Sequence, residues 1–348
     1  MKRRILSLFC VLALCLGLLP ATALADNGIL TYQYYDTTSG QMIEGTYNGE
    51  YTTLSGSDST TKAVSWEAGW YVVSGSVTYS ADDAAITASG DVNLILPAGS
   101  SLTLNFGRIS ISSGSTLNIY GQDTGSGTLT LKGGYRSTNS GIGLGSSSAL
   151  NIHGGTVKAT GYCYNKVDAA PGIDVGGSGT LTVYGGKVTA EAGTRSNAGY
   201  GAGIRVVTDG TVNIHGGTVT ATGASNKSAG GASGAGIGGN GAGGNGAGET
   251  CGNVTITGGT VTAIGGKNTA GNAQAPGIGG AVYLSSSGGA GTFSTGENGS
   301  AVITTTGGIQ ADTSGCSAII DNTVYGTVTL PDSLKTLKKN LLSPAGPR

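Results

Sequence analysis

The chain has 348 residues, and 67 of them are glycine, roughly a fifth of the chain where about 7% is usual. Charged residues make up 11% of the chain, with only 3 Phe and 2 Met, which argues against a conventional core of large apolar side chains. The glycines follow no three-residue period, which excludes collagen. Because no basic cluster could neutralise a row of phosphates, nucleic acid is not expected as a partner.

The N-terminus has the pattern of a secretory signal peptide. Basic residues occupy positions 2–4, an apolar run follows at 5–19, and Ala23-Leu24-Ala25 fits a cleavage site. The apolar run is too short for a membrane span. We expect residues 1–25 to be removed and the mature chain to be extracellular, either secreted or associated with the cell wall, without membrane contact. The mature chain would keep 15 basic and 19 acidic residues, a net charge of −4.

Residues 26–65 are polar and rich in tyrosine. We expect them to form an N-terminal cap, a hairpin that covers the open end of the structure that follows, because an open end would present an unpaired strand edge. Between residues 66 and 140, apolar and polar residues alternate at 92–96, 101–104, 116–120 and 128–131. Alternation is the period of a strand.

A repeat of about 31 residues fills positions 141–283. One copy reads S-A-L-N-I-H-G-G-T-V-K-A-T-G at 148–161, and related copies occupy 179–193, 210–223 and 252–265. A Gly-Ile pair precedes each copy, and a further one follows the last copy. Each repeat therefore predicts a short Gly-Ile strand, a second strand, a Gly-Gly corner and a third strand, with a variable loop before the next repeat.

Three strands per repeat and no helical stretch predict an all-β fold, a right-handed single-stranded parallel β-helix with terminal caps, extending over residues 66–330. Stacking of successive coils would bury columns of equivalent residues, such as Leu150, Leu181, Val212 and Val254. A last strand is expected at 323–330, and residues 331–348 are expected to form a C-terminal tail with a short helix around 333–341. The mature chain keeps Cys163, Cys251 and Cys316, and which two of them could pair is left open.

Several phrases resemble a known group of proteins. They include W-Y-V-V-S-G-S-V-T at 70–78, S-G-D-V-N-L-I-L at 89–96, S-T-L-N-I-Y-G-Q at 115–122 and the I-T-G-G-T-V-T-A run. The chain resembles secreted and wall-attached β-helix proteins of anaerobic Gram-positive bacteria, of the carbohydrate-binding-domain or adhesin-like kind. The resemblance implies the fold and a cell-surface context, although no L-P-x-T-G sorting signal is found.

Outward residues at equal repeat positions should be neighbours. His153, Tyr184 and His215 then form one column, which we interpret as a sugar-binding strip with Tyr184 as an aromatic platform; the alternative is an outward column without a ligand. The histidines would be two coils apart, too far for one metal ion, so no metal site is expected. Loop residues Tyr162, Tyr164 and Tyr200 are further candidates for stacking on sugars.

Asp174 and Arg205 should also be neighbours across two coils. The alternatives are a surface ion pair and contact with an acidic polysaccharide through Arg205. The acidic residues between 141 and 283 fall at different positions around the coil, so neither catalytic residues nor a cofactor is expected. The third strands carry an outward array rich in Thr. Such an array suggests ice binding, but Lys158, Lys187 and Glu191 interrupt it.

The sequence therefore predicts a non-catalytic protein that binds an extracellular polysaccharide or host glycan. The alternatives are a structural, adhesin-like stalk that binds a protein partner and, as a third class, a polysaccharide lyase. The oligomeric state is left open.

Overall fold

The computed structural model describes residues 25–58, 60–122, 127–133, 139–162, 170–193, 200–207, 209–225, 233–241, 248–267, 275–283, 286–287, 291–294, 301–307, 309, 319–320 and 323–324. These residues form strands and turns and contain no helix. None of them therefore makes a helix with the length and hydropathy that a membrane crossing requires.

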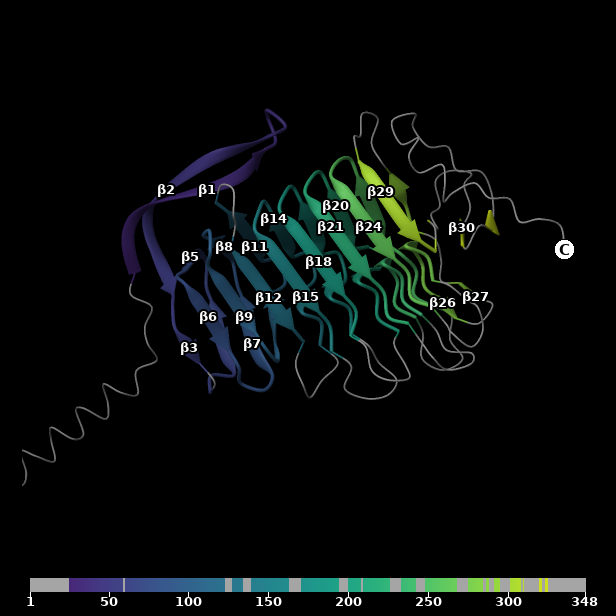
Figure 1. Ribbon diagram of the computed structural model, residues 1–348, viewed down its shortest axis with the longest axis horizontal. Coiled ribbons are helices and arrows are strands. Elements are labelled where there is room, and N and C mark those ends of the chain that lie inside the picture. The colour runs from purple at the N-terminus through teal and green to yellow at the C-terminus, as the bar shows by residue number, and fades with distance from the viewer. Residues whose placement is uncertain are drawn as a thin grey trace, which may run out of the picture.

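Three large sheets hold most of the strands, and the chain visits them in the repeated order C, A, B (Figure 1). Sheet A contains β1 (Ala25–Asp36), β2 (Gln41–Leu54), β5 (Gly69–Val73), β8 (Asp91–Leu96), β11 (Thr116–Gly121), β14 (Ala149–Ile152), β17 (Thr180–Val183), β20 (Thr211–Ile214), β23 (Asn253–Ile256) and β28 (Phe293–Ser294). Sheet B contains β3 (Ser57–Asp58), β6 (Ser76–Tyr79), β9 (Ser101–Leu104), β12 (Thr128–Lys132), β15 (Thr156–Thr160), β18 (Lys187–Glu191), β21 (Thr218–Thr222), β24 (Thr260–Ile264) and β29 (Val302–Thr306). Sheet C contains β4 (Ala63–Trp66), β7 (Ala84–Ala88), β10 (Gly107–Ile111), β13 (Ile142–Leu144), β16 (Ile173–Val175), β19 (Ile204–Val206), β22 (Ile237–Gly238) and β25 (Ile278–Gly279).

Two further strand pairs are small and antiparallel. They are β26 (Val282–Tyr283) with β27 (Ser286–Ser287), and β30 (Ile319–Ile320) with β31 (Thr323–Val324). The strand predicted at 323–330 is described only at β31, and the predicted tail and helix at 331–348 lie outside the described residues, as do residues 1–24.

The strands of sheets B and C are all parallel. In sheet A, β1 pairs antiparallel with β2 and with β11, and the pairings from β2–β5 onward are parallel. The predicted register is confirmed: Leu150 pairs with Leu181, and the columns that begin at Ile152, Val157 and Ile142 also continue from coil to coil. One apolar cluster fills the interior between the three sheets. This arrangement is all-β and consistent with a parallel β-helix.

The Gly-Gly corners between sheets A and B work as expected. The second glycine of each pair has a positive φ, at Gly155, Gly186, Gly217 and Gly259. Residues with a Cβ rarely adopt this conformation. The chain can therefore turn at the same place in every coil and keep the strands in register.

The N-terminal hairpin differs in position from the predicted cap. Residues 25–36 of β1 pair antiparallel with residues 41–52 of β2, and the end of β2 continues into the parallel part of sheet A, where residues 52–54 pair with 71–73 of β5. The first coil therefore begins before the expected boundary at residue 66. The rest of the hairpin runs along the outer face of sheet A, at the top of Figure 1, and Gln33 pairs with Gly121 of β11.

Candidate functional site

His153, Tyr184 and His215 do form one column on the outer side of sheet A. Ring centroids of His153 and Tyr184 lie 4.7 Å apart, and those of Tyr184 and His215 lie 5.3 Å apart, with the rings inclined by only 17° in each pair. Tyr120 extends the stack, with its ring centroid 4.9 Å from that of His153. The rings stack because parallel strands repeat every ~4.8 Å, close to the spacing that aromatic pairs favour.

The column is covered by the hairpin. The ring of Tyr35 on β1 stacks on Tyr184 with a centroid distance of 4.8 Å, and it lies 6.1 Å from the ring of His215. The backbone N–H of Tyr35 donates to Nδ1 of His153 over 3.1 Å. This surface is therefore occupied by the protein's own Tyr35, from the segment predicted as the N-terminal cap. The sequence pattern gives no sign of this contact.

Burial by the hairpin shifts the ionisation of the column. Desolvation lowers the pKa of His153 to about 4 and also lowers the pKa of His215. Desolvation, with a smaller contribution from the neighbouring Tyr35, raises the pKa of Tyr184. At neutral pH the two imidazoles are neutral, so the column carries no positive charge.

A second apolar cluster anchors the base of the hairpin. Outward-facing Val72, Ile95 and Tyr120 of sheet A pack with hairpin residues and Trp70. The ring of Tyr32 lies 4.7 Å from Tyr120 and 5.0 Å from Trp70. The sequence held a signal for this contact, since Ile95 and Tyr120 share a column with His153, and outward apolar residues in a row need a cover.

Asp174 and Arg205 are neighbours, as predicted, in the pairing of β16 with β19. The guanidinium NH1 of Arg205 donates to Oδ1 of Asp174 over 2.8 Å. Glu249 joins them, which the sequence analysis missed: its carboxylate accepts from Nε at 2.7 Å and from NH2 at 2.8 Å. The expectation that the acidic residues lie apart was therefore wrong for this pair.

This ion cluster holds Asn240 and Glu249, which lie between β22 and β23, against sheet C. The backbone N–H of Asn240 donates to Oε2 of Glu249 over 3.1 Å, and the side-chain carbonyl of Asn240 accepts from the N–H of Ala202. The pKa of the Arg205 guanidinium is raised, mainly by its hydrogen bonds to Glu249. Desolvation acts in the opposite direction and is outweighed. Because all three guanidinium nitrogens already donate to carboxylates, the geometry favours the ion pair over a glycan contact at Arg205.

The remaining sequence candidates lie elsewhere. Tyr162 follows β15 and Tyr200 precedes β19, so both belong to the connections between sheets B and C, away from the column on sheet A. The backbone of Tyr162 bonds to Asn139 and Ala170, and the carbonyl of Tyr200 accepts from Gly241. Tyr164 lies outside the described residues. The structure thus divides the predicted site among three separate places.

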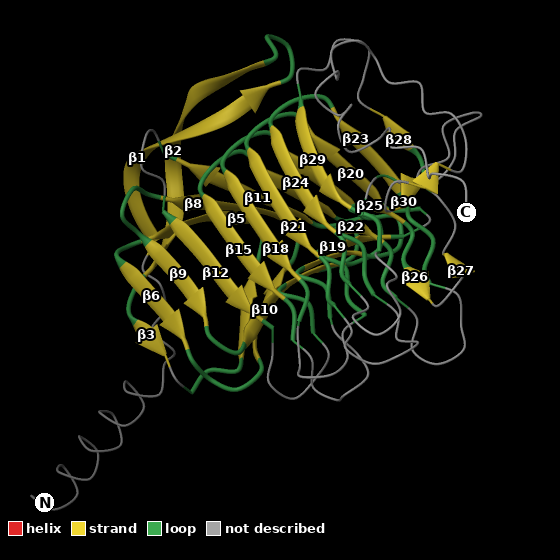
Figure 2. Ribbon diagram, turned by 45° about the vertical axis from the view of Figure 1, so that its right-hand side comes forward, coloured by secondary structure: helices red, strands yellow, loops and turns green. Residues whose placement is uncertain are grey.

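The outer face of sheet B is a third candidate surface. The predicted array is confirmed: Thr156 pairs with Lys187, Lys158 with Thr189 and Thr160 with Glu191, and the columns continue into β21 and β24. The column that passes through Lys158 and Thr189 continues in both directions from β6 to β29. Its members are Thr78, Thr103, Thr130, Lys158, Thr189, Thr220, Thr262 and Thr304. Its strands face the viewer side by side in Figure 2, while the hairpin lies over sheet A.

Two further observations concern reactive and metal-binding groups. Cys251 is buried and free, and burial raises the pKa of its thiol to about 12; Cys163 and Cys316 lie outside the described residues. Within the described part of the chain, no three His, Cys, Asp or Glu side chains are grouped so that they could hold a metal ion.

No family model, curated protein or solved structure matches this chain. The candidate surfaces are therefore judged by their own chemistry.

Proposed function

We propose that this protein is an extracellular, non-catalytic glycan-binding protein built on a right-handed, single-stranded parallel β-helix. In this proposal residues 1–25 direct export, and the chain is related to the secreted and wall-attached β-helix proteins that its phrases resemble. The repeated visits to sheets C, A and B and the stacked parallel strands support the β-helix.

The observation that carries the proposal is the outer face of sheet B. Its outward residues form straight columns of mostly Thr side chains across the pairings of β6 to β29, repeated every ~4.8 Å. Hydroxyl groups both donate and accept hydrogen bonds, as sugar hydroxyls do. A rigid row of equal, weak contacts suits a repeating polymer, because each contact makes the next one intramolecular.

The column of His153, Tyr184 and His215 is a weaker candidate for the glycan surface. A sugar ring stacked on Tyr184 would have to take the place of Tyr35, so binding there requires the hairpin to move. Sheet B requires no such rearrangement of the described residues, and we place the glycan on it.

The alternative function is a structural, adhesin-like stalk that binds a protein partner. The uninterrupted pairing of parallel strands in sheets B and C favours it, because such a stack is stiff and can act as a spacer. A polysaccharide lyase is the less favoured alternative, since Asp174 and Glu249 both accept hydrogen bonds from Arg205 instead of facing a substrate.

The test is a binding screen of the mature chain, residues 26–348, on an array of neutral and acidic polysaccharides, with release of reducing ends measured in the same wells. Binding without release is the expected result. Release of sugar would replace the proposal with an enzymatic function. If no polysaccharide is bound, the stalk that binds a protein partner becomes the better explanation.

A further inference from the structure

Three lysines lie on a straight diagonal across the outer face of sheet B. Lys132 is the last residue of β12, Lys158 the central residue of β15 and Lys187 the first residue of β18. The register pairs Thr130 with Lys158 and Lys158 with Thr189. Each lysine is therefore two residues earlier in its strand than the lysine of the preceding coil, and all three point to the same side of the sheet.

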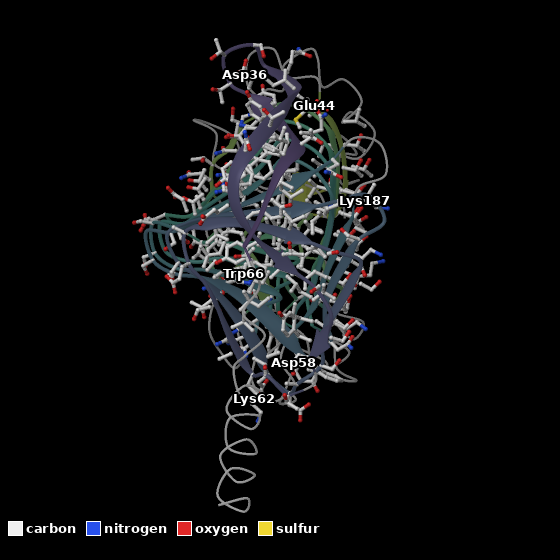
Figure 3. All side chains as sticks on the ribbon, turned by 90° about the vertical axis from the view of Figure 1, so that its left-hand side faces the viewer. Asp36, Glu44, Asp58, Lys62, Trp66 and Lys187 are labelled. Atoms are coloured by element: carbon white, nitrogen blue, oxygen red, sulfur yellow. The ribbon has the colours of Figure 1, made fainter. Side chains whose placement is uncertain are left out.

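The dimensions of a parallel sheet set the spacing of this line. One coil adds ~4.8 Å across the strands and two residues add ~6.6 Å along them, so neighbouring lysines start about 8 Å apart. All three side chains are exposed, and Lys187 points away from the interior where Trp66 is buried (Figure 3). The three lysines, here called the lysine diagonal, thus form one row of cations on a flat face.

The charges of the lysine diagonal are not neutralised by ion pairs within the described part of the chain. The ion pairs found there join Arg205 to Asp174 and to Glu249, on sheet C and its connection. On the same face, Glu191 is the nearest acidic residue in the strands of the diagonal, and it stands at the opposite end of β18 from Lys187. The mature chain is acidic as a whole, so this row is a local exception to its charge.

Most residues around the lysine diagonal bear a hydroxyl group. The other outward positions of β12, β15 and β18 are Thr128, Thr130, Thr156, Thr160, Thr189 and Glu191. None of them is aromatic, so the face offers no platform for nucleobases. Three cations also match poorly the charge density of a nucleic acid duplex, which carries one phosphate per ~1.7 Å.

We propose that the lysine diagonal binds the carboxylates of an acidic polysaccharide that crosses sheet B obliquely, with the threonine hydroxyls bonding to the sugar hydroxyls between the charges. This inference rests on the proposed function and deepens it, because it names the class of glycan and its place. It also moves the expected acidic contact from Arg205, whose guanidinium already donates to two carboxylates, to cations without partners of their own among the described residues. A lysine ammonium suits this role, as a compact cation with three rotatable donors on a flexible stem.

The experiment compares binding of the mature protein to polygalacturonate and to a neutral galactan of similar length, at low and high salt. We expect the wild type to bind polygalacturonate more tightly than galactan and to lose this preference at high salt. The variant K158Q/K187Q should bind polygalacturonate about tenfold more weakly, since each exposed charge pair contributes modestly. The control K62Q/K267Q removes the same charge outside the strands of sheet B and should bind as the wild type does.

A gain of affinity provides a readout that a folding defect could not mimic. Glu191→Gln removes the acidic residue of this face, and it should tighten binding to polygalacturonate while leaving galactan unchanged.

The outcomes separate the two proposals. If K158Q/K187Q binds polygalacturonate as the wild type does, the lysine diagonal is wrong while glycan binding stands. If the wild type binds neither polymer nor any other polysaccharide, the proposed function itself falls. If double-stranded DNA of equal charge competes as well as polygalacturonate, the face is a general polyanion site and the commitment to a polysaccharide is overturned.

Discussion

His153 is held in a setting that opposes its protonation. The rings of Tyr120 and Tyr184 lie on either side of its ring, at 4.9 Å and 4.7 Å. Its Nδ1 accepts the backbone N–H of Tyr35, and an added proton there would face a donor instead of an acceptor. The titratable side chains whose rings stack on it are Tyr120 and Tyr184, and burial raises the pKa of both phenols, so neither is negatively charged at neutral pH. No partner therefore compensates the cost of a buried imidazolium.

Because the folded state resists protonation of His153, this residue should make the protein less stable as the pH falls. The pKa of His153 is about 4 in the folded state and ~6.5 in the unfolded chain. The unfolded chain therefore takes up the proton first, so stability is lost as the pH falls below ~6.5 and the loss levels off near pH ~4. The full effect is at most about 3 kcal/mol.

Urea unfolding of the wild type and of His153→Gln between neutral and acidic pH measures this effect. Carboxylates titrate in both proteins, so the difference between the two isolates His153. The wild type should lose more stability on acidification than the variant does. Parallel pH dependences would show that His153 stays accessible to protons in the folded state.

At the level of elements, the hairpin β1–β2 behaves as a strap over sheet A. Trp70 lies between the hairpin and the sheet, with ring centroids 4.4 Å from Tyr47 and 5.6 Å from Tyr120. Gln122 adds a polar contact, because its side-chain amide donates to the carbonyl of Thr31. The hairpin is thus held on sheet A both by aromatic stacking and by the strand pairing of Gln33 with Gly121.

Tyr32→Ala should loosen the strap. The substitution removes ring contacts with Trp70, Tyr120 and Tyr34, each worth about 0.5–1.5 kcal/mol beyond its buried area. We expect the fluorescence of Trp70 to shift to the red and the hairpin to be cleaved faster by proteases. Thr46→Ala, at an exposed position of β2, is the control and should change neither. If Tyr32→Ala leaves both readouts unchanged, the strap is not held by these rings.

At the level of the whole molecule, close approach between coils depends on the glycine of the Gly-Ile pair. A Cβ on Gly203 would stand 2.4 Å from the backbone N of Thr222 and 2.8 Å from the carbonyl O of Gly236. Both neighbours are backbone atoms in regular pairings, so they cannot move without disturbing the stack. Gly172, Gly203 and Gly236, which precede isoleucines of sheet C, are therefore required for close stacking of the coils. The Gly-Gly corners need glycine for the turn and for stacking, because a Cβ on Gly217 would stand 2.6 Å from the carbonyl O of Gly186 in the preceding coil.

Gly203→Ala should destabilise the protein locally. We expect a loss of about 1–3 kcal/mol, as for overpacking in a core. Hydrogen exchange should show lost protection around β19 and β21, while β8 and β11 keep theirs, because each coil contacts only its neighbours. Gly114→Ala is the matched control, since its Cβ would meet nothing within 4 Å and only the positive φ of +69° opposes it, at about 1 kcal/mol. Uniform loss of protection along the chain would contradict this local view.

Much of this architecture could be predicted from the sequence, and the reason is its repetition. Two motifs that keep the same phase over four copies define which residue of one coil pairs with which residue of the next. The columns through Leu150 and Val157 were therefore correct in every pairing. The column of His153, Tyr184 and His215 and the pairing of Asp174 with Arg205 were correct for the same reason.

The sequence by itself thus determined the strand register and the composition of each outward column, because both depend on a period that can be read along the chain. Only the tertiary structure decided what covers those columns. Tyr35 meets His153 across 118 residues and Glu249 meets Arg205 across 44, and neither contact joins equivalent positions of the repeat. Contacts between a repeated and a non-repeated segment leave no period in the sequence, because they depend on where the hairpin and the connection pack once the coils have formed.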